Sequence, residues 1–223
     1  MVTGASRGLG RAVAEAYAGE GARLLLTATA LPRLEAAVEA CRSAGAEAVD
    51  PVTLDLADPG SVDAAAARAV AVLGRIDVLV NNAGLLGVRA PLAEYPLDVW
   101  DRVIAVGVTN TLRLVQRLLP AMADGAAIVN VTSGAAGRAT WGAYAVAKQA
   151  LEAMTGMLRD ELADRGIRCV AINPGPVRTA MRATAYPDED PATVPPPSAA
   201  VPPFVAVAEG ADPGPRVDAA GWR

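Results

Sequence analysis

The sequence predicts an α/β fold in which a parallel sheet carries helices on both faces. Short apolar runs alternate with longer segments of helical periodicity along most of the 223 residues, and this alternation is typical of such a sheet. The runs are near-continuously apolar, as expected of strands that are buried on both faces. A glycine-rich segment lies directly before the first helical segment.

Strands and helices follow one another in order. Strands are expected at Ala22–Ala28, Glu47–Leu54, Ile76–Asn81, Ala126–Thr132 and Ile167–Ile172. Helices are expected at Leu9–Gly19, Pro32–Ala44, Pro59–Leu73, Leu97–Ala123 and Tyr144–Arg165. Asp58 should cap the helix that begins at Pro59. Gly45, Gly74 and Gly166 each follow a helix, where a left-handed C-cap needs glycine.

The regular alternation ends after Pro174. Seven prolines between Tyr186 and Pro203 exclude long regular structure, so residues 182–204 are expected to form a proline-rich loop beside the substrate. A short helix at Ala199–Ala208 is possible if Pro203 falls near its first turn. We expect residues 1–223 to form a single domain without an internal repeat.

Composition excludes several classes of function. A hydrophobic fraction of 52% and a charged fraction of 20% predict a folded globule, and a net charge of −4 offers no basic surface for nucleic acid. No apolar run of about 18 residues predicts a membrane span, and Met1–Gly4 does not resemble a signal peptide. Cys41 and Cys169 are expected to be buried, reduced thiols of a cytoplasmic protein.

The chain contains no histidine. This excludes Ser-His-Asp hydrolysis, histidine-based zinc sites and histidine general-base catalysis. The acid or base must therefore be Tyr, Lys, Asp, Glu or Cys, and we expect no metal site.

The segment Thr3–Gly10 leads directly into a helical pattern. Its glycines would let the backbone approach a pyrophosphate, which would lie on the free N–H groups of the helix N-terminus. The spacing G-x-x-x-G-x-G differs from the G-x-G-x-x-G of longer dinucleotide-binding enzymes, and taken alone it predicts a simple turn equally well. The residues expected to bind a cofactor here are Gly4, Ser6, Arg7, Gly8, Leu9 and Gly10.

Polar residues also follow two buried strands. Asn81–Gly84 ends one strand, and ligands of open α/β sheets bind at the carboxyl ends of the strands. Asp55, which Leu56 follows, could accept a hydrogen bond from an adenine amino group, or it could cap the next segment. We expect cofactor contacts from Asp55, Leu56, Asn82, Ala83 and Gly84.

Tyr144 and Lys148 are four residues apart and therefore share one helix face. An ammonium group beside a phenol is expected to lower the tyrosine pKa from about 10 toward the working pH, as a general acid or base requires. Ser133 ends the preceding strand and could hydrogen-bond a substrate oxygen. An isolated Y-x-x-x-K pair is usually an exposed helix face, but together with the glycine turn and the serine it indicates catalysis.

These motifs, together with Asn173–Thr179, resemble the short-chain dehydrogenase/reductase family over nearly the whole chain. The resemblance implies a doubly wound Rossmann-type domain that transfers a hydride between a nicotinamide cofactor and a carbonyl or alcohol. It implies that Tyr144 donates or accepts the proton, that Ser133 orients the carbonyl, and that Lys148 holds the nicotinamide ribose. The other residues it assigns to the cofactor are Pro174, Gly175, Val177 and Thr179, the last two at the carboxamide.

The resemblance also implies a homodimer or homotetramer in the cytoplasm that acts on a small molecule. Residues 179–183 and 187–191 are similar to a bacterial subgroup of the family with no settled substrate. Two alternatives remain open. One is a nucleotide-binding protein that has lost catalysis, and the other is an epimerase or dehydratase on a related fold.

Three features depart from the family pattern. Gly107 stands where the family usually has an asparagine that supports a proton-relay water, and Asn110 could replace it or could be a surface residue. Ser133 precedes Tyr144 by eleven residues, two fewer than usual. Only two residues precede Thr3, so the first strand is almost absent and its neighbours would be left with unpaired backbone groups. A misassigned start codon or a damaged gene would explain this.

The end of the strand at Ala22–Ala28 bears on the choice of cofactor. An acid there would bind the ribose hydroxyls of NAD, and an arginine would suit the phosphate of NADP. Residues 26–30 contain neither. Arg7 offers a positive charge near that phosphate, so the sequence favours NADP and leaves NAD possible. Arg33 is a weaker candidate, because it is expected on a solvated helix face.

Overall fold

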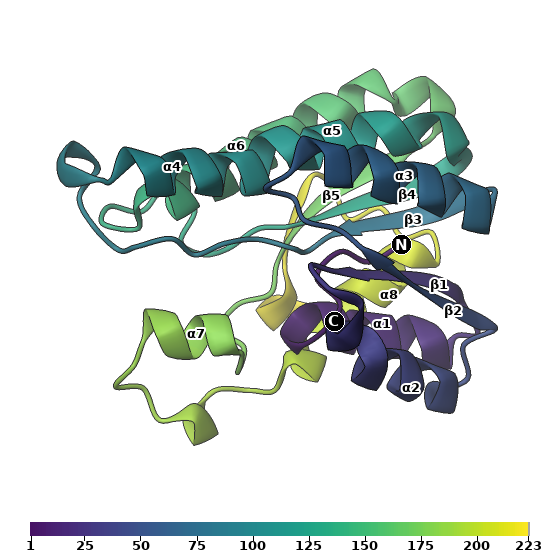
Figure 1. Ribbon diagram of the computed structural model, residues 1–223, viewed down its shortest axis with the longest axis horizontal. Coiled ribbons are helices and arrows are strands. Elements are labelled where there is room, and N and C mark those ends of the chain that lie inside the picture. Colours follow the sequence, from purple (N-terminus) through teal and green to yellow (C-terminus); the bar gives the residue numbers. More distant parts are fainter. Residues whose placement is uncertain (223) are drawn as a thin grey trace.

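The computed structural model describes residues 1–222 as a parallel sheet between two layers of helices (Figure 1). Its strands are β1 (Arg23–Ala28), β2 (Ala48–Thr53), β3 (Ile76–Asn81), β4 (Met122–Val131), β5 (Arg168–Asn173) and β6 (Arg216–Asp218). The strands pair in parallel in the orders β1-β2 and β3-β4-β5-β6. The predicted α/β class and parallel sheet are confirmed.

Residues Met1–Thr3 join the two halves of the sheet. The Val2 N–H donates to the Leu25 carbonyl at 2.9 Å, and the Thr3 N–H donates to the Val80 carbonyl at 3.0 Å. Figure 1 accordingly places the N-terminus between β1 and β3. These few residues therefore act as the central strand.

The Met1 ammonium group is buried inside the sheet. It donates to the Val78 carbonyl at 2.8 Å, and desolvation lowers its pKa to about 5. Beside it lies a cavity of about 470 Å³, which we call the N-terminal cavity, lined in part by Leu24, Ile76 and Val78 at the starts of β1 and β3. Residues Met1–Thr3 thus pair with β1 and β3 only beyond the first residues of those strands.

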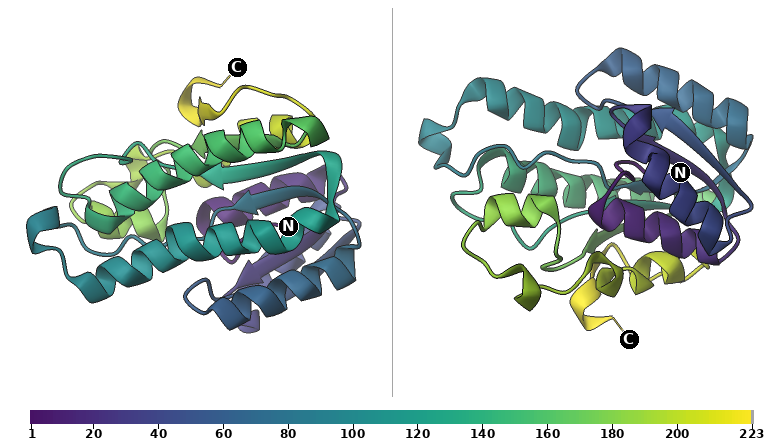
Figure 2. Two further views of the ribbon diagram at one scale, coloured as in Figure 1. Left: turned by 90° about the horizontal axis from the view of Figure 1, so that it is seen from above. Right: turned by 60° about the horizontal axis from the view of Figure 1, so that its bottom comes forward.

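Helices cover both faces of the sheet (Figures 1 and 2). The helices are α1 (Gly8–Gly19), α2 (Glu35–Ala44), α3 (Pro59–Leu73), α4 (Leu97–Ile104), α5 (Asn110–Leu118), α6 (Gly142–Glu161), α7 (Ala180–Ala185) and α8 (Pro202–Ala208). One face packs on α1, α2 and α8 around Leu26 and Phe204. The opposite face packs on α3, α5 and α6 around Leu79, Leu114 and Ile128. Apolar burial on both faces is what holds these layers together.

Most of the predicted helix caps are present. The Asp58 carboxylate accepts a hydrogen bond from the Gly60 N–H at 2.9 Å, before α3. Gly45 and Gly166 have φ of +110° and +62° in the left-handed region, as expected. Gly74 also has a positive φ, +68°, but its ψ of −52° lies outside that region. The left-handed cap predicted at Gly74 is therefore wrong, although the position still favours glycine.

The helix predicted over Leu97–Ala123 is present from Leu97 to Leu118, but a π-helical turn interrupts its α-helical geometry and its predicted end is wrong. α4 ends at Ile104, a π-helical turn spans Ala105–Thr109, and Met122 and Ala123 already belong to β4. Gly107 weakens the α-helical preference here, and the Thr111 hydroxyl donates to the Val106 carbonyl at 3.0 Å inside the turn. Pro120 then prevents the helix from continuing.

β2 differs from the strand that was predicted to be buried on both faces. Only Val49 and Val52 are buried along it, and Pro51 is exposed on this edge strand, where a missing N–H breaks no ladder. The short strand β6 was not predicted.

The proline-rich region contains α7 and two 3₁₀ turns, at Pro191–Thr193 and Pro197–Ala200, none of which was predicted. α8 begins with Pro202 and Pro203 in its first turn, close to the helix expected there. Cys41 and Cys169 are both buried and unbonded to each other, as expected. No helix within residues 1–222 combines the length and the apolar character that crossing a bilayer requires.

Candidate active site

A cavity of about 320 Å³, here called the active-site cavity, lies at the carboxyl ends of the strands. Most of the predicted site residues line it: Gly4, Ser6, Arg7, Gly8, Leu9, Asn82, Ala83, Gly84, Ser133, Tyr144, Lys148, Pro174, Gly175, Val177 and Thr179. Gly10, Asp55 and Leu56 do not. The chain segments that follow Val2, β3, β4 and β5 meet here, which is where an open parallel sheet binds ligands.

The glycine loop leaves the start of α1 open to an anion. Gly4 and Gly8 have φ of +65° and +59°, which L-residues with side chains rarely adopt. A Cβ on Gly10 would lie 2.5 Å from the Gly4 carbonyl oxygen, so Gly10 lets the loop and helix pack closely. Arg7 is the N-cap, and no side chain caps the helix. The first N–H groups of α1 are thus free to bind a phosphate.

Thr3 and Asn82 fasten this loop to the end of β3. The Thr3 hydroxyl oxygen accepts from the N–H groups of Asn82 and Ala83 at 2.9 and 3.0 Å. The Asn82 amide in turn donates to the carbonyls of Thr3 and Gly4 at 2.8 and 3.2 Å. Thr3 was not singled out from the sequence, although a polar residue inside a central strand was a signal.

Ser133, Tyr144 and Lys148 meet at one end of the cavity. Ser133 follows β4, and the other two lie on α6, where Tyr144 is 8% exposed. The Lys148 Nζ donates to the Val131 carbonyl at 2.6 Å and lies 5.6 Å from the centroid of the Tyr144 ring. Burial lowers the pKa of Lys148 to about 8.

The predicted lowering of the Tyr144 pKa by Lys148 is wrong for this structure. Burial raises the pKa of Tyr144, and a hydrogen bond with the Ser133 hydroxyl offsets part of this rise. The Lys148 ammonium is directed to the Val131 carbonyl rather than to the phenol oxygen. Tyr144 therefore remains a protonated phenol at neutral pH, which suits a proton donor.

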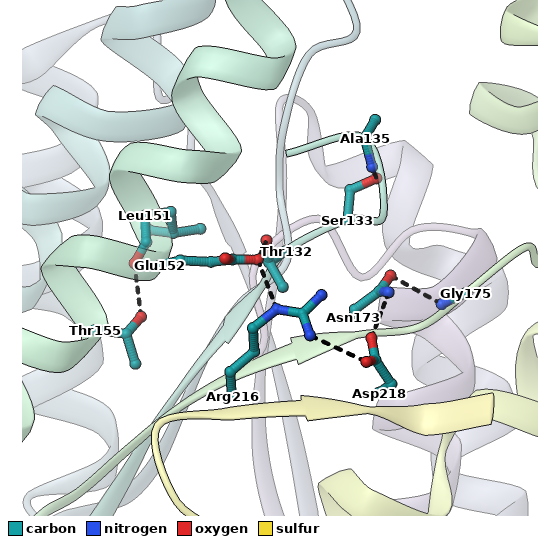
Figure 3. Close-up of polar contacts among 10 residues, drawn as sticks. All are labelled: Thr132, Ser133, Ala135, Leu151, Glu152, Thr155, Asn173, Gly175, Arg216 and Asp218. Carbon is teal, nitrogen blue, oxygen red and sulfur yellow. Dashed lines mark hydrogen bonds and ion pairs between the residues drawn. The ribbon is translucent and has the colours of Figure 1, made fainter. Parts of the chain in front are cut away.

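A chain of polar contacts supports the strand ends below the cavity (Figure 3). The Arg216 guanidinium binds Glu152 on α6 and Asp218 on β6, both at 3.0 Å. Asp218 accepts from the side-chain Nδ2 of Asn173 at 2.6 Å, and the side-chain Oδ1 of Asn173 accepts from the Gly175 N–H at 3.1 Å. These contacts link the turn at Gly175 to α6. Nothing in the local sequence of β6 indicated them.

Two residues weighed as relay or cofactor groups have structural partners. Asn110 is buried and donates its amide to the Leu56 carbonyl at 2.8 Å, so it is neither a surface residue nor directed at Tyr144. Asp55 accepts from the Ala57 N–H at 2.8 Å, a local turn before α3. This contact agrees with the capping alternative for Asp55.

The comparisons with known proteins agree with this geometry. The family model described as short chain dehydrogenase matches residues 1–190. The uncharacterized oxidoreductase YciK of Escherichia coli (strain K12) is 40% identical over 197 residues, 86% of this chain and 78% of that protein. Sorbitol dehydrogenase of Cereibacter sphaeroides is 37% identical over 185 residues, 79% of this chain and 69% of that protein.

Solved structures are similar over nearly their whole length. A short chain dehydrogenase from Shigella flexneri 2a str. 301, complexed with NADP, superposes with a TM-score of 0.91 at 36% identity, covering 98% of this chain and 95% of that one. A short chain dehydrogenase from Escherichia coli CFT073, complexed with NADPH, gives a TM-score of 0.90 at 36% identity, covering 98% and 94%.

Proposed function

Because the chain belongs to the short-chain dehydrogenase family and is an oxidoreductase of that family, we propose that it transfers a hydride between NADP(H) and a small carbonyl or alcohol substrate, with Tyr144 as the general acid or base. The observation that carries the proposal is the meeting of Tyr144, Ser133 and Lys148 at one end of a cavity whose other end is the open N-terminus of α1.

The residues present fit NADP. The free N–H groups of α1 suit the pyrophosphate, and β1 ends without an acid that would repel a further phosphate. Arg7 is exposed, lines the cavity and makes no ion pair within residues 1–222. Two similar structures carry NADP or NADPH. NAD remains the alternative cofactor, and Arg33 the weaker candidate for the phosphate contact.

The other predicted cofactor contacts belong to the same proposal. Asn82, Ala83 and Gly84 would lie along the dinucleotide after β3. Pro174, Gly175, Val177 and Thr179 would border its nicotinamide end, and Asp55 and Leu56 the adenine. Gly10 acts indirectly, by letting the loop approach α1.

Side chains of the protein would donate and accept the proton. When bound, NADPH supplies the hydride that reduces the carbonyl carbon. Tyr144, which burial keeps protonated, delivers its proton to the carbonyl oxygen, and the Ser133 hydroxyl donates a hydrogen bond to that oxygen. In alcohol oxidation the same proton returns to the phenolate. Lys148 places a positive charge close to the ring, which stabilises the phenolate.

The substitution Tyr144→Phe tests the proposal. We expect the reduction rate to fall about 100- to 10,000-fold, with NADPH affinity nearly unchanged because the ring remains. Tyr17→Phe is the matched control: it removes the buried hydroxyl that donates to the Phe204 carbonyl at 3.0 Å, so it should reduce stability without reducing turnover. Retention of more than about a third of the parent rate in Tyr144→Phe contradicts a general acid.

NADPH binding without turnover on any carbonyl would support a nucleotide-binding protein that has lost catalysis, the alternative that Gly107 favours.

A cytoplasmic homodimer or homotetramer also belongs to the proposal. The two buried, unbonded thiols support a cytoplasmic location, and membership of the family supports the homo-oligomer. Size-exclusion chromatography with light scattering would test the assembly.

A further inference from the structure

The part of the active-site cavity around Tyr144 is apolar and aromatic. Leu86, Trp141, Ala185 and Tyr186 line the cavity and pack with Tyr144 in one cluster. The Trp141 ring lies 6.0 Å from the Tyr144 ring and 5.7 Å from the Tyr186 ring, centroid to centroid. A substrate oxygen that contacts Tyr144 would therefore bring the atoms next to the carbonyl against these side chains.

Of the charged side chains that line this cavity, Arg182 is the one the cofactor and the proton transfer do not use. Its guanidinium donates to both carboxylate oxygens of Glu189, at 2.7 and 2.6 Å. Its central carbon also lies 3.7 Å from the centroid of the Tyr186 ring. Both side chains of the pair are about three-quarters buried, so solvent screens their attraction less than at an open surface. The charge of Arg182 is already neutralised.

Arg89 holds the aromatic rings from outside the cavity. Its guanidinium carbon lies 4.6 Å from the Trp141 ring centroid and 5.6 Å from that of Tyr186. It also donates to the Ala185 carbonyl at 3.1 Å, which ties the segment after β3 to α7. Arg89 does not line the cavity, so it positions the rings and leaves their cavity side apolar.

The backbone before Trp141 is strained. Thr140 has φ +66°, the one positive φ among the non-glycine residues that the structure describes. A β-branched residue is rarely found there, and such strain persists only where the surrounding structure imposes it. The short segment between Ser133 and Tyr144 turns at Thr140, and Trp141 follows directly with 7% exposure. The strained residue therefore directly precedes the one whose ring lies beside Tyr144.

We propose that the substrate is an uncharged carbonyl compound with a flat apolar group next to the carbonyl, that Trp141 and Tyr186 bind this group, and that Glu189 excludes anionic substrates by neutralising Arg182. This rests on the proposed function, since it places the carbonyl at Tyr144. A carboxylate entering this region would lose its hydration, while the cation that lines the cavity beside Tyr186, Arg182, is already paired with Glu189. A charge left unpaired in the complex is one of the ways in which proteins discriminate against a ligand.

Two probes of nearly equal shape test the proposal: methyl 4-acetylbenzoate, which is neutral, and 4-acetylbenzoate, which carries a carboxylate. Binding of each to the complex of the protein with NADP⁺ is measured by titration calorimetry, where no reduction occurs. We expect the neutral ester to bind at least about tenfold more tightly. With NADPH, the ratio of kcat/KM values should favour the ester in the same direction.

Variants separate the two parts of the proposal. Glu189→Gln frees the charge of Arg182 and should narrow the preference for the ester about threefold or more. Asp212→Asn is the matched control, because Asp212 binds Arg159 through two similar contacts at 2.7 and 2.6 Å outside the cavity; it should leave the preference unchanged. Trp141→Ala should weaken binding of the ester about three- to tenfold, and so should Tyr186→Ala, which removes a half-buried ring.

Equal or tighter binding of the carboxylate to the parent would overturn the proposal, as would an unchanged preference in Glu189→Gln or no binding of either probe. If Trp141→Ala does not fold, Tyr186→Ala decides the aromatic contact. Failure of the proposed function would look different: NADPH would not bind, or turnover would survive in Tyr144→Phe.

Discussion

Gly107 packs directly against Ala147: a Cβ built on Gly107 would lie 3.0 Å from the Cβ of Ala147. Gly107 belongs to the π-helical turn between α4 and α5, and Ala147 stands on α6 between Tyr144 and Lys148. A side chain at position 107 would therefore press on the helix that carries both residues proposed for proton transfer. The helices can pack this closely because position 107 carries glycine and not the asparagine that is usual in the family.

We predict that Gly107→Asn alone destabilises the protein by about 1–3 kcal/mol, because the new side chain overpacks against α6. The double variant Gly107→Asn with Ala147→Gly should recover most of the lost stability. If the missing asparagine limits the proton relay, only the double variant should turn over faster than the parent. Thermal unfolding and kcat measured on both variants check this; a single variant as stable as the parent would contradict the packing argument.

Lys148 should give the reduction reaction an alkaline limit. Since burial lowers its pKa to about 8, the ammonium is charged below that pH and neutral above it. We predict that kcat/KM for carbonyl reduction falls as the pH rises through about 8. In Lys148→Arg, whose guanidinium stays charged, any remaining activity should not show this fall. A parent profile that is flat up to pH of about 10 would show that the charge of Lys148 is not needed.

Arg7 should set the preference for NADPH over NADH. A partly exposed guanidinium near a phosphate contributes about 1–2 kcal/mol, so Arg7→Ala should narrow the ratio of the two dissociation constants about five- to thirtyfold. Arg68→Ala, which removes an exposed arginine that does not line the active-site cavity, should leave the ratio unchanged. Tighter binding of NADH by the parent would refute the choice of cofactor.

Replacing Thr140 by glycine should stabilise the fold. A left-handed backbone costs an L-residue about 1–2 kcal/mol, and glycine adopts φ +66° without that cost. Part of the gain is lost because glycine makes the unfolded chain more flexible. We therefore expect a net gain of about 1 kcal/mol in urea unfolding. The neighbouring change Gly142→Ala should do the opposite, because its Cβ would overlap the Tyr95 ring.

The buried Met1 ammonium should make stability rise with pH. Its pKa is about 5 in the folded protein against 8.0 for the free group, so between these values the unfolded chain binds a proton that the folded chain lacks. The free energy of unfolding therefore increases from about pH 5 to about pH 8, by up to about 4 kcal/mol, and the full penalty remains below pH 5.

Adding four or five apolar residues before Met1 tests the same feature. The extension replaces the ammonium with an amide and can fill the N-terminal cavity with paired strand. We expect a higher melting temperature and loss of the pH dependence between about 5 and 8. An extended chain that melts at the parent temperature would mean that the added residues do not enter the sheet.

Local patterns were enough to predict much of the fold and the site. Apolar runs located β3 and the other central strands, and Asp58-Pro59 located the start of α3. The cluster of Ser133, Tyr144 and Lys148 followed from the spacing of Tyr144 and Lys148 and from the serine at the end of a strand.

What local patterns could not predict depends on contacts between distant residues. The pKa of Tyr144 depends on how deeply α6 is buried. The pairing of Arg182 with Glu189 depends on how α7 and the turn after it fold over the cavity. The close approach of Gly107 to Ala147 depends on how the π-helical turn packs on α6.

The two edges of the sheet are poor templates for further strands. On β2, Pro51 has no N–H to offer, and Asp50 places a carboxylate beside it. On β6, the strand is only three residues long, and Arg216 and Asp218 flank its single valine. Short, charged or proline-bearing edges resist edge-to-edge pairing, the first step of β-aggregation. Concentrated protein should therefore not aggregate by adding strands to the native sheet, and copies that associate natively would meet through surfaces other than the sheet edges.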